Sequence, residues 1–153
     1  MTARTVARVK IVRLPQGRDL PLPRRATSQS AGFDLQACID SSVEIRPGDR
    51  ALVPTGIAVA LPRGYEAQIR PRSGLALRSG LTLLNTPGTV DADYRGEVRL
   101  IVVNLGREPV TVHRGDRLAQ MVVLELPAVE LEEVEEIPGS ERGEGGFGHT
   151  GVR

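Results

Sequence analysis

Short apolar runs, each closed by Gly, Pro or Asp, follow one another along most of this chain. They span residues 4–14, 33–38, 42–46, 50–53, 56–61, 65–70, 97–104 and 118–126. Regularly spaced strand patterns without long helical segments are typical of an all-β sandwich or barrel. The pattern favours one helix, a short one around residues 74–79. We therefore expect an all-β fold in which 97–104 and 118–126, the most apolar segments, are the central strands.

Composition predicts how the core is filled and where it ends. Aromatic residues make up 3% of the 153 residues and Trp is absent, so Val and Ile are expected to fill the core. Residues 130–136 include five Glu, which is typical of a solvated connecting segment. Residues 139–153 contain six Gly and one aromatic residue, too little apolar surface to order the segment alone. We predict a core that ends near residue 127, a domain over 1–138 and a flexible tail over 139–153.

Charge and cysteine content exclude several classes of protein. The 20 basic and 19 acidic residues nearly cancel, and no long basic block exists to bind duplex nucleic acid. Cys38 is the only cysteine, so no intrachain disulfide can form, and with His113 and His149 it is too little for a common zinc site. No apolar run suits a signal peptide or a membrane span. We expect a cytoplasmic protein with neither nucleic-acid nor membrane partners.

Two Gly-Asp pairs mark tight turns, at residues 46–49 and 113–116. The second includes Arg114-Gly115-Asp116, which is also the cell-adhesion tripeptide. Because it lies between two strand patterns in a chain without secretion signals, we interpret it as a structural turn.

Five segments are rich in residues that carry chemistry: 31–35, 71–76, 85–97, 117–121 and 142–148. In the second, an arginine, a hydroxyl and a glycine precede the expected helix and could bind an anion. The simpler interpretation, which this segment alone favours, is that Ser73 caps the helix. The tail segment has no net charge over residues 139–153, so a flap that closes on a ligand fits better than an RNA-binding arm.

The third segment contains Asp91 and Asp93, two positions apart. On a strand both would point to one face, where a carboxylate pair can bind a metal or divide acid and base roles. The alternative is a polar β-turn. Pro87-Gly88 and Arg95-Gly96 bracket the pair as turn formers, which predicts a hairpin whose backbone groups could bind the edge of a planar ligand.

Taken together and in this order, the five segments resemble the motifs of the trimeric dUTPases, from about residue 24 to 151. The most specific are residues 88–97 and 145–148. The resemblance implies a distorted jelly-roll subunit and a homotrimer with active sites shared between subunits. It also implies hydrolysis of dUTP to dUMP and pyrophosphate with Mg²⁺, by attack of an Asp-activated water on the α-phosphate. Such an activity supplies dUMP for dTMP synthesis and keeps uracil out of DNA.

The resemblance also implies residue roles. Asp91 would be the general base that deprotonates water, and Tyr94 would pack against deoxyribose and exclude a 2′-hydroxyl. The uracil would be bound by Asn85 and by the hairpin backbone at Thr89 and Val90.

The phosphates would be held by Arg72, Ser73, Gly74 and Gln120. No side chain would ligate Mg²⁺ directly; Asp34 would support metal-bound waters or neighbouring arginines. From the tail, Arg142, Phe147 and Gly148 would cover the terminal phosphate and the base. Two positions depart from the family pattern: His149 stands where Ser is usual, and Phe33 where Tyr is frequent.

Two other functions compete. A dCTP deaminase on the same fold would need a group that activates water at C4 of the base, and the second and fifth motifs fit a dUTPase better. A non-catalytic nucleotide-binding module would be expected to lack Asp91, which is present.

Overall fold

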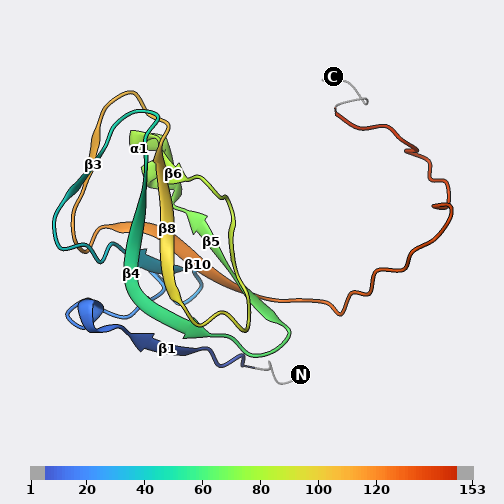
Figure 1. Ribbon diagram of the computed structural model, residues 1–153, viewed down its shortest axis with the longest axis horizontal. Coiled ribbons are helices and arrows are strands. Elements are labelled where there is room, and N and C mark those ends of the chain that lie inside the picture. Colours follow the sequence, from blue (N-terminus) through green and yellow to red (C-terminus); the bar gives the residue numbers. More distant parts are fainter. Residues whose placement is uncertain (1–5, 148–153) are drawn as a thin grey trace.

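The computed structural model describes residues 6–147 (Figure 1). Its first antiparallel sheet contains, from edge to edge, β1 (Lys10–Arg13), β4 (Arg50–Ala60), β8 (Glu97–Asn104) and β6 (Leu81–Leu83). The second contains β2 (Phe33–Gln36), β10 (Arg117–Glu125), β5 (Tyr65–Pro71) and β7 (Gly88–Val90). A small third sheet pairs β3 (Val43–Ile45) with β9 (Val110–Val112). The predicted all-β jelly roll is confirmed.

The core lies between the two four-stranded sheets and is aliphatic. Leu100 and Val53 of the first sheet and Ile69 and Met121 of the second belong to one buried cluster. Valine and isoleucine make up half of the 20 residues in this cluster, as expected, and leucine is as frequent as valine. Inward positions of a strand accept any aliphatic side chain of suitable volume, which composition alone does not resolve.

The two most apolar segments are central strands, as predicted. β8 lies between β4 and β6, and β10 lies between β2 and β5. β6, β7 and β9 were not predicted, because three residues are too few to display an alternating pattern. At the N-terminus the predicted strand over 4–14 shrinks to β1, and its first residues lie outside the described chain.

Pro54 does not divide β4 into the two strands that the sequence suggested. The strand continues through it: Pro54 pairs in register with Arg99 of β8, and the Pro54 carbonyl accepts a hydrogen bond from the amide of Cys38 at 2.8 Å. The pairing with β8 shifts register between Pro54 and Ala58, around Gly56 with its φ of 70°. Proline and glycine therefore bend this strand at an irregularity of the sheet.

The predicted short helix is α1 (Ser73–Ser79), which ends at Gly80 in the left-handed conformation. A 3₁₀ turn, η1 (Pro15–Gly17), follows β1. Both predicted turns are present, with φ of 83° at Gly48 and 84° at Gly115. No helix within residues 6–147 has the length and apolarity needed to cross a membrane.

The chain leaves the sheets where the core was predicted to end. β10 ends at Glu125, and the amide of Leu126 donates to the carbonyl of Gly64 at 2.8 Å. Residues 127–147 then run away from the sheets without a strand or helix, as the orange-to-red trace in Figure 1 shows.

Candidate active site

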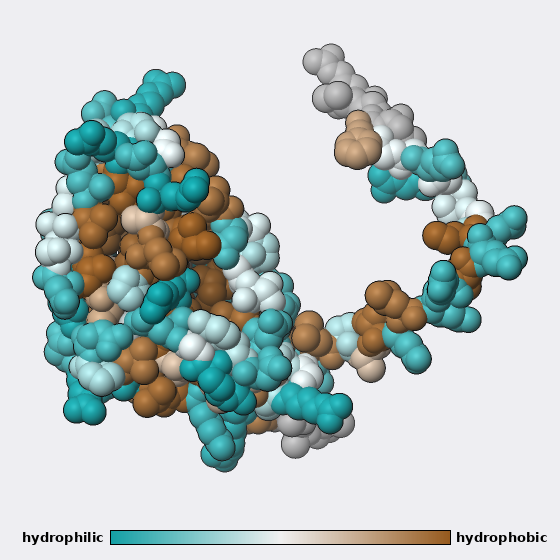
Figure 2. Space-filling view, viewed as in Figure 1, coloured by the Kyte–Doolittle hydropathy of each residue, from teal (hydrophilic) through white to brown (hydrophobic). Residues whose placement is uncertain are grey.

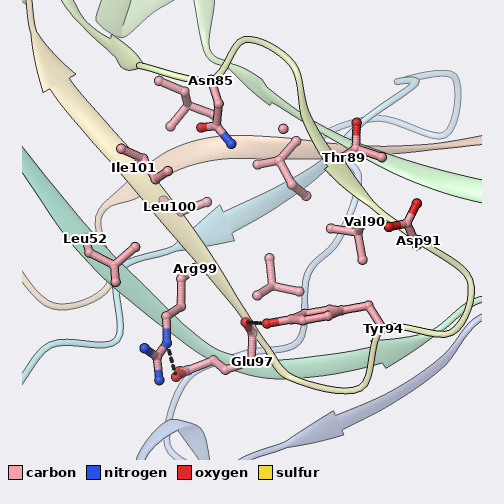
Figure 3. Close-up of a pocket in the computed structure, with 14 residues that line it drawn as sticks. Leu52, Asn85, Thr89, Val90, Asp91, Tyr94, Glu97, Arg99, Leu100 and Ile101 are labelled. Atoms are coloured by element: carbon pink, nitrogen blue, oxygen red, sulfur yellow. Dashed lines mark hydrogen bonds and ion pairs between the residues drawn. The ribbon is translucent and has the colours of Figure 1, made fainter.

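A cavity of about 210 Å³ opens beside the segment that follows β6 (Figure 3). Five of the predicted site residues line it: Asn85, Thr89, Val90, Asp91 and Tyr94. Leu52 and residues 97–101, from β4 and β8, form its other wall. The residues expected to bind the nucleobase and the sugar therefore lie around one cavity. Asp91, the expected general base, lies there too.

The segment between residues 87 and 97 is a crossover between sheets and not a β-hairpin. β7 pairs with β5 in the second sheet, whereas β8 pairs with β4 and β6 in the first. The predicted hairpin is thus wrong in its pairing, although the turn residues do reverse the chain. Because the crossover joins the two sheets, its residues lie at the edge of the core, where a cavity can form.

Asp91 and Asp93 do not share a strand face, which corrects the first interpretation of this pair. β7 ends at Val90, and the amide of Tyr94 donates to the carbonyl of Asp91 at 3.2 Å, which closes a turn. Both residues are exposed, but Asp91 lines the cavity and Asp93 lies outside the lining. The polar turn is therefore the correct alternative, and the two carboxylates have different surroundings.

A second group of predicted residues lies across β2, β5 and β10. The carboxylate of Asp34 receives Arg72 Nε at 3.3 Å and Arg117 Nη1 at 3.0 Å, and its side chain is 17% exposed. Register pairs Asp34 with Gln120 across β2 and β10. Asp34 thus holds two guanidinium groups beside Gln120.

The remaining members of this group surround the start of α1. Ser73 is the first helical residue and Arg72 occupies the N-cap position, so the prediction that Ser73 caps the helix is wrong. The Gln120 amide donates to the carbonyl of Pro71 at 3.0 Å, which fixes it next to this loop. Gly74 faces Arg78, whose Nη1 would lie 3.2 Å from an added Cβ.

We call the set Asp34, Arg72, Ser73, Gly74 and Gln120, together with Arg117, the second arginine on Asp34, the arginine group. None of these residues is among those that line the cavity in the described subunit. The structure therefore divides the predicted site into two parts of one subunit, a cavity and an arginine group.

The tail residues belong neither to the cavity lining nor to the arginine group. Arg142 Nε donates to the carbonyl of Gly145 at 2.7 Å, a contact within the tail. Phe147 is fully exposed and has a φ of 49°. Gly148 and His149 lie outside the described residues.

Sequence reasoning gave no role to Arg117 or Glu97, although both belong to the quoted motifs. Arg117 meets Asp34 across 83 positions of the chain, and only strand register brings them together. Glu97 lines the cavity, accepts a hydrogen bond from the amide of Gly56 at 2.9 Å and pairs with Arg99 Nε at 3.2 Å. Its side chain is 9% exposed, so it is a fixed part of the cavity wall.

The charged pair with the clearest effect on ionisation lies outside the site. Arg114 of the predicted turn donates to Asp19 through Nη2 at 2.6 Å and Nε at 3.1 Å. This hydrogen bonding lowers the pKa of Asp19 below its ordinary value and raises that of Arg114. Arg114 Nη2 also donates to the carbonyl of Gln16, so the pair fastens the η1 loop to the turn before β10.

Within residues 6–147 no group of three or more His, Cys, Asp or Glu side chains is placed to hold a metal ion. Both oxygens of Asp34 already face arginines.

The two-sheet β jelly roll thus combines a carboxylate-lined cavity with guanidinium groups of the kind that suit a phosphorylated ligand. A profile of the dUTPase family matches residues 18–151. The chain belongs to the dUTPase family, and it is accordingly an enzyme.

Individual relatives agree with this assignment. The deoxyuridine 5'-triphosphate nucleotidohydrolase of Caldanaerobacter subterraneus subsp. tengcongensis is 57% identical over 144 residues, which cover 94% of this chain and 97% of the relative. The Anaplasma marginale protein of the same name is 55% identical over 145 residues, 95% and 99% of the two chains. Among solved structures, a mutant dUTPase of Staphylococcus bacteriophage 80alpha with dUpNHpp has a TM-score of 0.83 at 26% identity, over 95% of this chain and 99% of that one.

Proposed function

We propose that this enzyme hydrolyses dUTP to dUMP and pyrophosphate, with water attacking the α-phosphate. The names of the relatives and the nucleotide analogue bound in the phage enzyme support this substrate. The observation that carries the proposal is the cavity, which brings the amide of Asn85, the carboxylate of Asp91 and the ring of Tyr94 to one place. Asn85 suits the nucleobase, Tyr94 suits the sugar, and Asp91 suits the attacking water.

In this mechanism Asp91 acts as the general base. Its carboxylate accepts a proton from the attacking water and orients it in line with the leaving pyrophosphate. The turn that closes on the Asp91 carbonyl supports this role, because it fixes the backbone that carries the carboxylate. Water is the nucleophile, and no covalent intermediate is needed.

Uracil would be bound by the amide of Asn85 together with backbone groups at Thr89 and Val90. β7 pairs with β5 on one side, so backbone groups on its other edge are free of ladder bonds within the described chain. They can form hydrogen bonds with the edge of a planar base. Tyr94 would lie against the deoxyribose and leave no room for a 2′-hydroxyl.

The arginine group would hold the triphosphate. Guanidinium groups suit phosphate oxygens because several N–H donors point in one direction. Mg²⁺ held by the phosphates and water, with Asp34 in its outer shell, would neutralise negative charge on the triphosphate. Asp34 itself keeps Arg72 and Arg117 in place while the substrate is absent.

The separation of the cavity from the arginine group supports a homotrimer with shared active sites. A cavity on one subunit and an arginine group on its neighbour can face each other across an interface. An apolar patch over β4 and β8 (Figure 2), where exposed Leu52 neighbours Ile101, supports an interface on that face. Light scattering is expected to give about three times 16.5 kDa; an active monomer would contradict the shared site.

The tail is proposed to close over the bound nucleotide, with 139–153 as the moving segment and 1–138 as the rigid domain. Phe147 would stack on the uracil, and Arg142 would bind the terminal phosphate. The full exposure of Phe147 in the free subunit supports this proposal, because its ring is available to a ligand. In the cell, the reaction would supply dUMP for dTMP synthesis and keep uracil out of DNA, in the cytoplasm.

A panel of nucleoside triphosphates tests the reaction. We expect pyrophosphate and dUMP from dUTP, and far less pyrophosphate from dTTP, dCTP and UTP. Ammonia released from dCTP would identify a deaminase instead. Binding of dUTP without release of pyrophosphate in the presence of Mg²⁺ would identify a non-catalytic nucleotide-binding module.

A further inference from the structure

The turn that follows Asp91 is held by its own hydrogen bonds before any ligand arrives. The Tyr94 amide donates to the carbonyl of Asp91 at 3.2 Å. Arg95 Nη1 donates to the carbonyls of Ala92 at 2.7 Å and of Tyr94 at 3.0 Å. The backbone that carries Tyr94 is therefore fixed on both sides of this residue.

The ring of Tyr94 is also fixed, at its far end. Its hydroxyl donates to the carbonyl of Glu97 at 3.0 Å, and Figure 3 shows the ring extending from its loop toward that carbonyl. The acceptor is well anchored, since the Glu97 carboxylate bonds the amide of Gly56 and pairs with Arg99. Tyr94 is nevertheless 45% exposed and lines the cavity, so part of the residue remains accessible from there.

Gly96 lies directly against this ring. A Cβ built on Gly96 would lie 2.3 Å from the Tyr94 hydroxyl oxygen, 2.6 Å from Cζ and 3.0 Å from Cε2. All three of its nearest atoms belong to Tyr94. Gly96 is not among the glycines with a positive φ, unlike Gly56 or Gly80, so its φ does not require glycine. The ring, and not the backbone conformation, is what requires glycine here.

We propose that Gly96 is a specificity-determining position for the sugar. It acts through Tyr94: the missing side chain lets the ring lie across the turn and reach the Glu97 carbonyl, in the position from which it excludes a 2′-hydroxyl. The inference rests on the proposed function, in which Tyr94 packs against deoxyribose. Gly96 is thus a positioning residue and makes no contact with the nucleotide itself.

The substitution Gly96→Ala should separate folding from selection. The atoms in the way are the far end of one partly exposed side chain, which can swing aside while the sheets remain intact. We expect the variant to fold, and its dUTP/UTP ratio of kcat/KM to fall by about tenfold or more, the scale on which a misfitting group is discriminated. Most of the change should come from faster UTP hydrolysis.

A cycle of wild type, Gly96→Ala, Tyr94→Ala and the double variant tests this. Both single variants are expected to lower the dUTP/UTP ratio, and Gly96→Ala is expected to add nothing in the Tyr94→Ala background. If Tyr94→Ala leaves the ratio unchanged, the proposed sugar role of Tyr94 fails. If Tyr94→Ala lowers the ratio but Gly96→Ala does not, or if Gly96→Ala still lowers it without the ring, the present inference fails alone.

Gly64→Ala is the matched control. Gly64 has a φ of 82° and open space around its Cα, so alanine strains the turn before β5 without touching Tyr94. Its melting temperature should fall while the dUTP/UTP ratio stays at the wild-type value. A fall in the ratio here would show that loss of stability alone relaxes selection, and would overturn the inference.

Two further measurements test the ring position, one that needs no turnover and one in a variant that leaves Gly96 intact. The chain has two tyrosines and no tryptophan, so in a Tyr65→Phe background the fluorescence reports on Tyr94 alone. Gly96→Ala should increase quenching of Tyr94 by acrylamide, and Tyr94→Phe should lower the dUTP/UTP ratio by releasing the ring from Glu97. Unchanged quenching in a folded variant, or an unchanged ratio in Tyr94→Phe, would contradict the proposed ring position.

Discussion

The crossover between Asp91 and Glu97 carries residues of the proposed site, and so does the tail, residues 139–153. The two are held very differently. In the crossover, Tyr94 and Arg95 bond backbone carbonyls nearby, and Glu97 ties the end of the turn to Gly56 on β4. In the described tail, the hydrogen bonds beyond Leu126 are local, such as Gly143 to Ser140 and Arg142 to Gly145.

This difference indicates which part of the site is already ordered before the ligand binds. Side chains on the crossover are positioned by the sheets, so binding there needs little further ordering. Tail side chains must be ordered when the ligand binds, at a cost of about 1–2 kcal/mol for each backbone residue fixed. Substitutions in the crossover should therefore affect chemistry and selection, whereas substitutions in the tail should affect only the closed state.

Asp91→Asn is expected to have the largest effect. Asparagine keeps the shape of the side chain but cannot accept a proton from water, and loss of a general base typically lowers turnover by about 10²–10⁴-fold. Nucleotide binding, measured by calorimetry with dUpNHpp, should be retained. Asp93→Asn is the matched control and should keep most of its turnover, since Asp93 does not line the cavity. Near-wild-type turnover in Asp91→Asn would show that the crossover does not supply the general base.

Deleting residues 141–153 is expected to have the second largest effect. Stacking on an aromatic ring is worth about 1–3 kcal/mol per base, so the truncated enzyme should hydrolyse dUTP roughly tenfold to a hundredfold more slowly. Its melting temperature and its affinity for dUMP should match those of the full chain, because the core ends before the tail.

Limited proteolysis separates closure from a passive tail. Saturating dUpNHpp should protect the tail, and dUMP, which lacks the terminal phosphates, should not. Equal protection of the tail by both ligands, or full activity after truncation, would show that the tail is passive and does not close over the bound triphosphate.

The sequence predicted the β class, both central strands and the end of the core, because apolar runs and glycine content are local signals. It failed where long-range pairing decides the structure. β7 joins β5 and not β8, which no local pattern reveals. Likewise the partnership of Asp34 with Arg117 depends on the register of β2 with β10. The roles of Asp91 and Tyr94 came from resemblance to a family, and the structure adds the contacts that fix them.

Asp34→Asn should have an intermediate effect. It extends the comparison to the arginine group. The substitution removes the charge that faces Arg72 and Arg117, and hydrogen bonds to charged groups contribute about 1.5–3 kcal/mol. We expect a lower free energy of unfolding and a higher KM for dUTP, because both guanidinium groups lose their common anchor. Asp40→Asn, at an exposed residue, should change neither quantity. An unchanged KM would show that phosphate binding by Arg72 and Arg117 does not depend on Asp34.

The smallest expected effect concerns an ion pair of the rigid domain. Asp19 accepts two hydrogen bonds from Arg114, and this bonding places the pKa of Asp19 below its ordinary value of 3.8. A carboxyl group whose pKa is lower in the folded than in the unfolded chain stabilises the fold above the unfolded pKa. That stabilisation is lost as the pH falls through the folded pKa.

Asp19→Asn should therefore lower the melting temperature slightly at pH 7, and the difference from wild type should shrink as the pH is taken below about 3.8. The effect is small because water screens an exposed pair. Glu141→Gln removes one carboxylate from the tail, which forms no ion pair within the described chain, and should leave the melting temperature unchanged at every pH. Because the Asp19 pair fastens the η1 loop to the turn before β10, its loss should act on the sheets. A tail substitution with the same pH dependence would show that the tail also packs against the folded domain.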